Sequence, residues 1–452
     1  MRSIKMRSLV ASAAAALSIS GVAAVVSPTP AYAIAVPPCD SHVDYWTDVL
    51  LTIFRKQTGE AGAPTRLTRA AAMMYLAMYD TDISLGTPGT PYIAKVAKTD
   101  NATYIPTSNF DAAATTALHN AFPSFDLSGY QSTAAKSCFN GEPGPDGFSS
   151  QLGLTAAQNV INARANDGSN NTTAYSPQSN VAGQWRPTEG KAAVSPNWGS
   201  VKPFGIGTST QFRPPLPGGF SSMSALLTSK AYADQVNEVK AAGSATATPD
   251  QRTADQTTAA YFWANDVDGT YKPPGQLLKI TQEYSKANPG SNRIKLFALL
   301  SMAMADSAIA AWDAKFDTII DLWRPDSAIE ESQSDNNALT TPSPAWTPLS
   351  ADAAGNHFSP PFPAYISGHA TFAGAWAGVM KRYYGTDAAT FTATTEDIHA
   401  SGVTRTFTSF SAAAQEDALS RLWLGVHYRW DADYGLSTGD SVANYVFGNR
   451  LR

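Results

Sequence analysis

The sequence Phe362-Pro-Ala-Tyr-Ile-Ser-Gly-His-Ala-Thr-Phe-Ala-Gly-Ala-Trp-Ala-Gly-Val-Met-Lys-Arg-Tyr-Tyr384 joins a short polar motif to a helix-forming run. From Ala370 to Tyr384 the apolar residues recur at intervals of three and four, which predicts a helix. Ser367, Gly368 and His369 should therefore lie at its N-terminus, where backbone N–H groups and the helix dipole favour a bound anion. A serine before a helix can also act solely as an N-cap, and that alternative stays open for Ser367.

A second motif, Ser420-Arg-Leu-Trp-Leu-Gly-Val-His427, adds a guanidinium and another imidazole. Six residues separate Arg421 from His427, so at about 100° per residue they do not share one face of a straight helix. We expect the chain to break at Gly425 and a new helix to follow, within which Asp431 could reach His427. A carboxylate behind an imidazole fixes its tautomer and raises its basicity, which suits a nucleophile or a metal ligand. The alternative for Asp431 is a surface partner four residues along a helix.

A third motif, Leu322-Trp-Arg-Pro325, supplies another guanidinium. Pro325 disfavours α geometry at Arg324, so we expect Arg324 at the end of a helix from Ala308 to Trp323. Lys315 could add an ammonium donor, although a lone lysine is usually solvated and a lone arginine can be a structural ion-pair residue. The three motifs together supply hydroxyl, imidazole and guanidinium groups for a tetrahedral or trigonal-bipyramidal oxyanion. The sequence therefore predicts a phosphate-like or vanadate-like site.

Helical periodicity dominates the rest of the chain, and few segments alternate like strands, so the predicted fold class is mainly α. Further helices are expected at residues 46–56, 66–81, 155–165, 224–241, 254–265, 276–286, 294–311 and 417–422. The region from Asn171 to Gly219 is rich in proline and glycine and cannot be regular helix. Its aromatic residues, among them Trp185 and Trp198, favour an ordered connection over a disordered linker.

The first 33 residues are typical of a secretory signal peptide. Arg2, Lys5 and Arg7 precede an apolar run, and Ala31-Tyr-Ala33 is a small-x-small cleavage motif. We expect cleavage after Ala33 and a secreted protein with no stable membrane anchor, because no later segment looks long and apolar enough to span a bilayer. A retained N-terminal anchor is the alternative.

Loss of three positive residues with the signal peptide would change the net charge from −5 to −8. This balance argues against nucleic acid as a partner. In an exported protein the two cysteines, Cys39 and Cys138, could form a disulfide, although two unpaired thiols are also compatible with the sequence.

These motifs closely resemble the vanadium-dependent haloperoxidase branch of the type 2 phosphatidic acid phosphatase (PAP2) superfamily. The resemblance is carried by residues 360–372 and 420–431, extends through Ala311-Trp-Asp-Ala-Lys315 and Leu322-Trp-Arg-Pro325, and weakens towards the N-terminus. It implies an all-α fold of two packed helical bundles with Pro/Gly-rich connecting loops. We divide the chain accordingly into a signal peptide (1–33), an N-terminal helical region with the Pro-rich connection (34–220) and a C-terminal bundle carrying the anion site (221–452).

The resemblance also implies roles for the site residues. His427 would bind the vanadium of a vanadate cofactor, and His369 would be the acid/base group for hydrogen peroxide. The vanadate oxygens would accept hydrogen bonds from Arg324, Ser367, Gly368 and Arg421. A halide, or a small organic substrate, would then be oxidised, and Phe362 hints at the chloroperoxidase-like members.

Two alternatives remain at this point. In the phosphatase branch, no metal is needed: His427 would attack the phosphorus of a phosphoester to form a phosphohistidine, and His369 would protonate the leaving group. An exported, non-catalytic protein that binds an oxyanion is the second alternative. Its motivation is one departure from the family pattern.

That departure concerns Lys315. The family's lysine usually lies seven residues before the arginine of Arg-Pro, whereas Lys315 lies nine before Arg324 and Asp317 occupies the seventh position. On an uninterrupted helix this shift would turn the lysine by about 200°, away from the cavity. A bulge or loop would restore it. Ile366, where many members have proline, is a milder change.

Overall fold

The computed structural model describes residues 41–99, 105–136, 150–177, 181–187 and 190–452. These residues all belong to one compact unit that runs from Ile34 to Arg452. The expected signal peptide and both cysteines, Cys39 and Cys138, lie outside the described residues. The division of the remaining chain at residue 220 stays a prediction.

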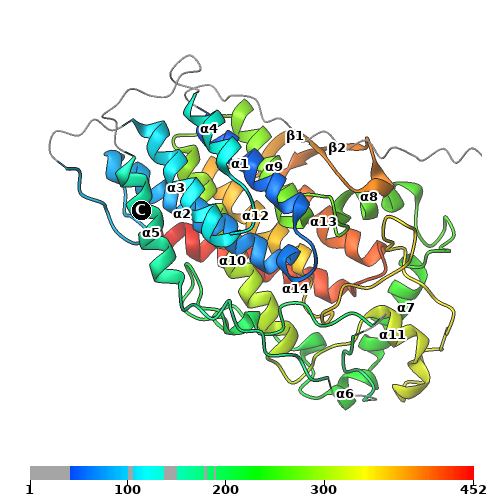
Figure 1. Ribbon diagram of the computed structural model, residues 1–452. Coiled ribbons are helices and arrows are strands. Elements are labelled where there is room, and N and C mark those ends of the chain that lie inside the picture. The colour runs from blue at the N-terminus through cyan, green and yellow to red at the C-terminus, as the bar shows by residue number, and fades with distance from the viewer. Residues whose placement is uncertain (1–40, 100–104, 137–149, 178–180, 188–189) are drawn as a thin grey trace, which may run out of the picture. The chain divides into compact units, whose positions relative to one another are not determined.

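The expected all-α fold is confirmed, with 56% of residues in helices and 5% in strands. Figure 1 shows how the helices are arranged. The α-helices of the described residues are α1 (His42–Lys56), α2 (Pro64–Leu85), α3 (Pro106–Ala121), α4 (Ser128–Ala135), α5 (Gln151–Arg164), α6 (Met223–Leu227), α7 (Lys230–Ala242), α8 (Ala254–Ala264), α9 (Lys272–Ala287), α10 (Arg293–Phe316), α11 (Pro325–Glu330), α12 (Gly368–Tyr384), α13 (Phe410–Trp423) and α14 (Arg429–Asn449).

Some helices differ from the expected ones. The single helix expected at 224–241 is two helices, α6 and α7, because the hydroxyl of Ser229 accepts the N–H of Tyr232 and starts a new helix there. The predicted elements did not include α3 and α4, nor the antiparallel hairpin of β1 (Ala388–Thr394) and β2 (Thr404–Ser409). In the hairpin, alternate residues such as Phe391 and Phe407 are buried, so its inner face packs on the helices.

Helix α10 lies at the centre of the core. It packs against α2 from the N-terminal half and against α12 and α14 from the C-terminal half. By length and composition it could cross a membrane, which corrects the expectation that no such segment follows the signal peptide. Because 89% of its apolar window is buried inside the protein, it is a core helix here.

Helices α12 and α14 pack most closely, and small residues at their contact explain why. A side chain at Gly374 would collide with the backbone of Leu436, and one at Gly439 would collide with the carbonyl of Thr371. The missing Cβ atoms therefore let the two backbones approach. This contact fixes the start of α12, which carries the first motif, against the start of α14.

The Pro-rich connection is ordered where the structure describes it, as expected. Trp185 and Trp198 are buried. The connection pairs with the segment that precedes Arg324, because the N–H of Trp185 donates to Asp321 O (2.6 Å) and the N–H of Trp323 donates to Gly183 O (2.8 Å). The N-terminal half thus holds a segment of the C-terminal half in place.

Candidate oxyanion site

Arg324 reaches the site from a loop. Helix α10 ends at Phe316, so the helix expected from Ala308 to Trp323 is wrong, and Arg324 is instead the residue that precedes α11 in extended geometry. Its buried guanidinium donates from Nε to Phe362 O (2.7 Å) and from Nη1 to Val426 O (2.6 Å). The same Nη1 lies 3.0 Å from His427 Nε2. Arg324 therefore joins the segments that carry both motifs.

The first motif starts α12 as predicted. Helix α12 begins at Gly368, and the hydroxyl of Ser367 accepts the N–H of Ala370 at 3.3 Å, so Ser367 does act as an N-cap. The backbone N–H of Ser367 donates to Asp431 O at 3.0 Å, which ties the motif to α14. The first turn of α12, with its N–H groups and positive dipole end, lies beside the basic residues of the site.

His369 is almost fully buried in the first turn of α12. Its Nε2 lies 3.1 Å from Ala264 O and 3.9 Å from Asp266 Oδ1. Because a carbonyl only accepts, Nε2 carries the proton and Nδ1 keeps its lone pair. Burial, together with the positive charge of Arg421, lowers the pKa of His369 to about 3. The ring is therefore neutral near pH 7 and can accept a proton.

The second motif breaks where expected. Helix α13 ends at Trp423, and Gly425 has a φ of +80°, which a residue with a side chain adopts only under strain. The chain then enters α14, whose first turn places Asp431 Oδ2 2.9 Å from Nδ1 of His427. Asp431 is fully buried, so it is not a surface partner.

The contact between His427 and Asp431 sets the tautomer of the imidazole. Nδ1 donates to the carboxylate, so Nε2 carries the lone pair, which accepts from Nη1 of Arg324 in the structure. A ligand or an electrophile would take the place of that hydrogen bond at Nε2. Burial and the charges of Arg324 and Lys315 lower the pKa of His427 well below its usual value. Burial raises the pKa of Asp431 to about 7. Both shifts favour a neutral imidazole.

Arg421 has a partner that sequence reasoning missed. Its Nη2 lies 2.5 Å from Asp266 Oδ2, in the loop between α8 and α9. Burial raises the pKa of Asp266, but the charge of Arg421 and the hydrogen bond that it donates outweigh that effect, so the pKa is lowered and the carboxylate stays charged. The signal available in the sequence was the acidic turn Asp266-Val-Asp268, next to a site with two arginines that needed a counter-ion.

Three guanidinium nitrogens of the site have no hydrogen-bond partner among the described residues. They are Nη2 of Arg324 and Nε and Nη1 of Arg421, all of them buried. An unpaired donor of this kind is costly away from water. An oxyanion beside His427 would accept from these donors, so the residues present fit a vanadate or a phosphate.

Lys315 is neither solvated nor turned away from the motifs. Helix α10 ends one residue after it, and its ammonium is buried, donating to Pro363 O (2.7 Å) and Ala364 O (3.2 Å). It hydrogen-bonds to the segment before Ser367 and lies near His427. Burial and the charge of Arg324 lower the pKa of Lys315, and the charge of Asp431 opposes that shift. Asp317, at the family's usual lysine position, lies instead near Asp313 and Arg213. The lysine shift therefore no longer argues for a decayed site.

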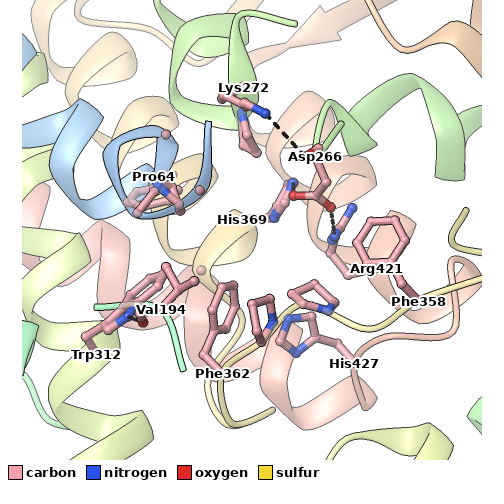
Figure 2. Close-up of a pocket in the computed structure, with 18 of the residues that line it drawn as sticks. Pro64, Val194, Asp266, Lys272, Trp312, Phe358, Phe362, His369, Arg421 and His427 are labelled. Atoms are coloured by element: carbon pink, nitrogen blue, oxygen red, sulfur yellow. Dashed lines mark hydrogen bonds and ion pairs between the residues drawn. The ribbon is translucent and has the colours of Figure 1, made fainter. Parts of the chain in front are cut away.

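A cavity of about 190 Å³ opens onto these groups. Figure 2 shows His369 near the centre of the cavity, with Arg421 and His427 to its right. Phe362 lies below His369, and Pro64, Val194 and Trp312 lie to the left. The Trp312 and Phe362 ring centroids are 4.9 Å apart. Pro64 and Val194 come from the N-terminal half, so both halves of the chain form the cavity wall.

The C-terminal part of the chain, which carries the site, is similar to known proteins. The family model described as the VCPO second helical-bundle domain matches residues 295–451, which include all three motifs. Residues 295–451 are thus similar to the second helical-bundle domain that this model describes. Vanadium chloroperoxidase from Curvularia inaequalis is 30% identical over 251 residues, or 44% of this chain and 40% of that protein. The match thus spans less than half the length of the curated relative.

Two solved structures share the fold over nearly their whole length. A bacterial vanadium-dependent iodoperoxidase superposes with a TM-score of 0.75 at 22% identity, covering 91% of this chain and 96% of that one. A holo-type bacterial vanadium-dependent chloroperoxidase superposes with a TM-score of 0.63 at 17% identity, covering 93% and 94%. The helical-bundle fold of the vanadium haloperoxidases therefore extends beyond residues 295–451 to most of the chain.

Proposed function

We propose that this chain is a secreted, vanadate-dependent haloperoxidase that oxidises a halide with hydrogen peroxide. The observation that carries the proposal is the set of unpartnered guanidinium nitrogens of Arg324 and Arg421 around the imidazole of His427. The similarity of residues 295–451 to the VCPO second helical-bundle domain supports the same proposal. Export rests on the N-terminal sequence alone.

In this proposal five residues hold vanadate directly, and two carboxylates orient them. His427 would bind vanadium through Nε2, while Asp431 holds the ring by its Nδ1–H. Arg324, Arg421, Ser367 and Gly368 would donate to the vanadate oxygens, with Arg421 oriented by Asp266. Bound vanadate would supply the Lewis-acidic centre that activates hydrogen peroxide for halide oxidation.

His369 would move the protons of the reaction. Its Nε2–H is held by Ala264 O, so Nδ1 is the atom that can take a proton from hydrogen peroxide and return it later. The low pKa of His369 keeps this nitrogen unprotonated before an anion arrives. Next to an anion the pKa rises, because negative charge offsets Arg421, and the imidazole becomes a better proton acceptor.

Phosphoester hydrolysis is the second candidate, and the His427–Asp431 contact favours it as well. A neutral Nε2 backed by a carboxylate can attack phosphorus, and the same guanidinium groups would stabilise the transferring phosphoryl group. Turnover of p-nitrophenyl phosphate that vanadate inhibits, and that His427→Ala abolishes, would support a phosphatase.

The deciding experiment measures halide oxidation by the purified mature protein. Iodide, bromide and chloride are each offered with hydrogen peroxide, with and without orthovanadate, and His427→Ala serves as the inactive control. We expect oxidation of at least one halide that depends on orthovanadate. Halide oxidation that orthovanadate does not stimulate would refute the haloperoxidase proposal.

A further inference from the structure

The loop between α8 and α9 supplies two contacts to the site. Ala264, the last residue of α8, accepts the proton of His369 Nε2, and Asp266 holds Arg421. The loop spans residues 265–271 and is bracketed by two residues with positive φ, Asn265 (+44°) and Lys272 (+61°). The positions of His369 and Arg421 therefore depend on the conformation of this loop.

The side chain of Lys272 closes the loop upon itself. Its Nζ donates to Val267 O at 2.9 Å and to Asp268 Oδ1 at 2.8 Å, and lies 3.5 Å from Asp266 O. The residue is only 5% exposed although it lines the cavity mouth. Figure 2 shows Asp266 between Lys272 on one side and Arg421 on the other. The ammonium thus contacts all three residues that follow Asn265, namely Asp266, Val267 and Asp268.

The backbone of Lys272 indicates that this side chain matters. A φ of +61° is unfavourable for a residue with a Cβ atom, and glycine would adopt it without strain. Strained backbone of this kind persists only where the surrounding contacts hold it, and it is common at functional sites. At this position the contacts are those of the ammonium with the loop and the hydrogen bond from the backbone N–H of Lys272 to Thr270 Oγ1 (3.3 Å).

We propose that Lys272 is a positioning residue of the oxyanion site: its ammonium fixes the α8–α9 loop so that Asp266 holds Arg421 towards the anion. The proposal rests on the proposed function only in that an oxyanion binds beside Arg421 and His427. It does not depend on which reaction takes place there. Without the ammonium, Val267 O and Asp268 lose their common donor and the loop can relax. Asp266 then no longer fixes the guanidinium, and the anion is bound less tightly.

The test measures the dissociation constant of orthovanadate by titration calorimetry, with inorganic phosphate as a second probe. Lys272→Met keeps the length of the side chain but removes its charge, and we expect about tenfold weaker binding of both anions. Lys272→Arg keeps the charge, and binding should return to within about threefold of the native protein. Lys230→Met is the matched control, because Lys230 also pairs with an aspartate four residues away but is exposed on α7.

Two further variants separate positioning from stability. Lys272→Gly relieves the positive φ, so it should melt at or near the native temperature and yet bind as weakly as Lys272→Met. Asp268→Ala removes one acceptor of the ammonium at an exposed position, and we expect a two- to threefold loss of anion affinity that does not depend on how well the Lys272 variants fold.

The outcomes distinguish this inference from the proposed function. Native affinity in Lys272→Met or Lys272→Gly would overturn the positioning role, and so would an arginine variant as weak as the methionine variant. If the native protein binds the anions but oxidises no halide, the proposed function fails while the role of Lys272 is still decided by the titrations. If the native protein binds neither anion, both fail.

Discussion

Asp266 Oδ2 lies 2.5 Å from Nη2 of Arg421, while Nε and Nη1 of the same guanidinium have no partner among the described residues. The carboxylate thus occupies one edge of the arginine and leaves the other donors available. A guanidinium with one fixed edge is preorganised for an anion, because less side-chain entropy is lost on binding. Other groups of the same oxyanion site can be tested separately.

The carboxylate behind His427 should set the affinity for vanadate. Asp431→Asn can still accept the Nδ1–H through its amide oxygen but lacks the charge that makes Nε2 basic. We expect orthovanadate to bind about 10- to 100-fold more weakly, as measured by titration calorimetry. Asp433→Asn, an exposed position two residues along the same helix, should bind as the native protein does. Equal affinity in both variants would contradict the role of Asp431.

Anion binding should be coupled to proton uptake at His369. Burial and Arg421 lower the pKa of His369 to about 3, and a bound anion offsets that positive charge and raises the pKa. When an anion binds and raises the pKa of His369, the imidazole takes up protons at pH values above its starting pKa. The affinity for the anion should therefore increase as the pH falls from about 6 towards 4.

This coupling can be measured with sulfate, whose charge stays constant over that range. Titrations at pH 5 in buffers with different ionisation enthalpies should report net proton uptake by the native protein. His369→Gln should bind sulfate with less proton uptake and a flatter dependence on pH. Identical proton uptake in the two proteins would mean that another group titrates.

The buried ammonium of Lys315 should strengthen anion binding through its charge. Lys315→Met removes a positive charge close to His427, which we expect to weaken orthovanadate binding about fivefold, or roughly 1 kcal/mol. Lys295→Met, near the other end of the same helix, is the control. Thermal melting of both variants shows whether the protein remains folded, and unchanged affinity in a folded Lys315→Met variant would remove Lys315 from the cradle.

The cavity lined by Trp312 and Phe362 should accept an organic ring in addition to the halide. Its volume of about 190 Å³ exceeds what a halide and a peroxide molecule need, and apolar side chains form much of its wall. Val194→Phe fills part of this space. We expect the KM for phenol bromination to rise at least fivefold while bromide oxidation without phenol stays within twofold.

Val181→Phe makes the same change at an exposed position outside the cavity and should alter neither reaction. The rate of phenol bromination could instead change in parallel with the rate of bromide oxidation in the native protein, Val194→Phe and Val181→Phe. In that case the ring does not bind in the cavity and reacts with released hypohalous acid.

Much of the site could be predicted because its motifs are local. Ser367, Gly368 and His369 are neighbours at a helix start, and the interval from His427 to Asp431 is one helical turn once Gly425 breaks the chain. Such relationships depend on helix geometry, which short stretches of sequence determine.

The remaining features depend on tertiary contacts. Asp266 and Arg421 are 155 residues apart, and nothing in the local pattern links them. The apolar pattern also suggested that the helix before Arg324 continues to Trp323, whereas the chain leaves α10 at Phe316 and pairs with Gly183 and Trp185. Because the helix ends at Phe316, the direction of Arg324 is not tied by helix geometry to that of Lys315, and both side chains reach the segment from Phe362 to Ala364.

The same backbone pairing has an evolutionary consequence. Trp185 and Gly183 belong to the N-terminal half, yet they hold the segment that delivers Arg324 to the C-terminal bundle. A recombination could exchange the N-terminal half for that of a distant relative and keep every motif of the C-terminal half. It would still disturb the backbone pairing that positions Arg324. The two halves of this chain should therefore be inherited together, as one unit of selection.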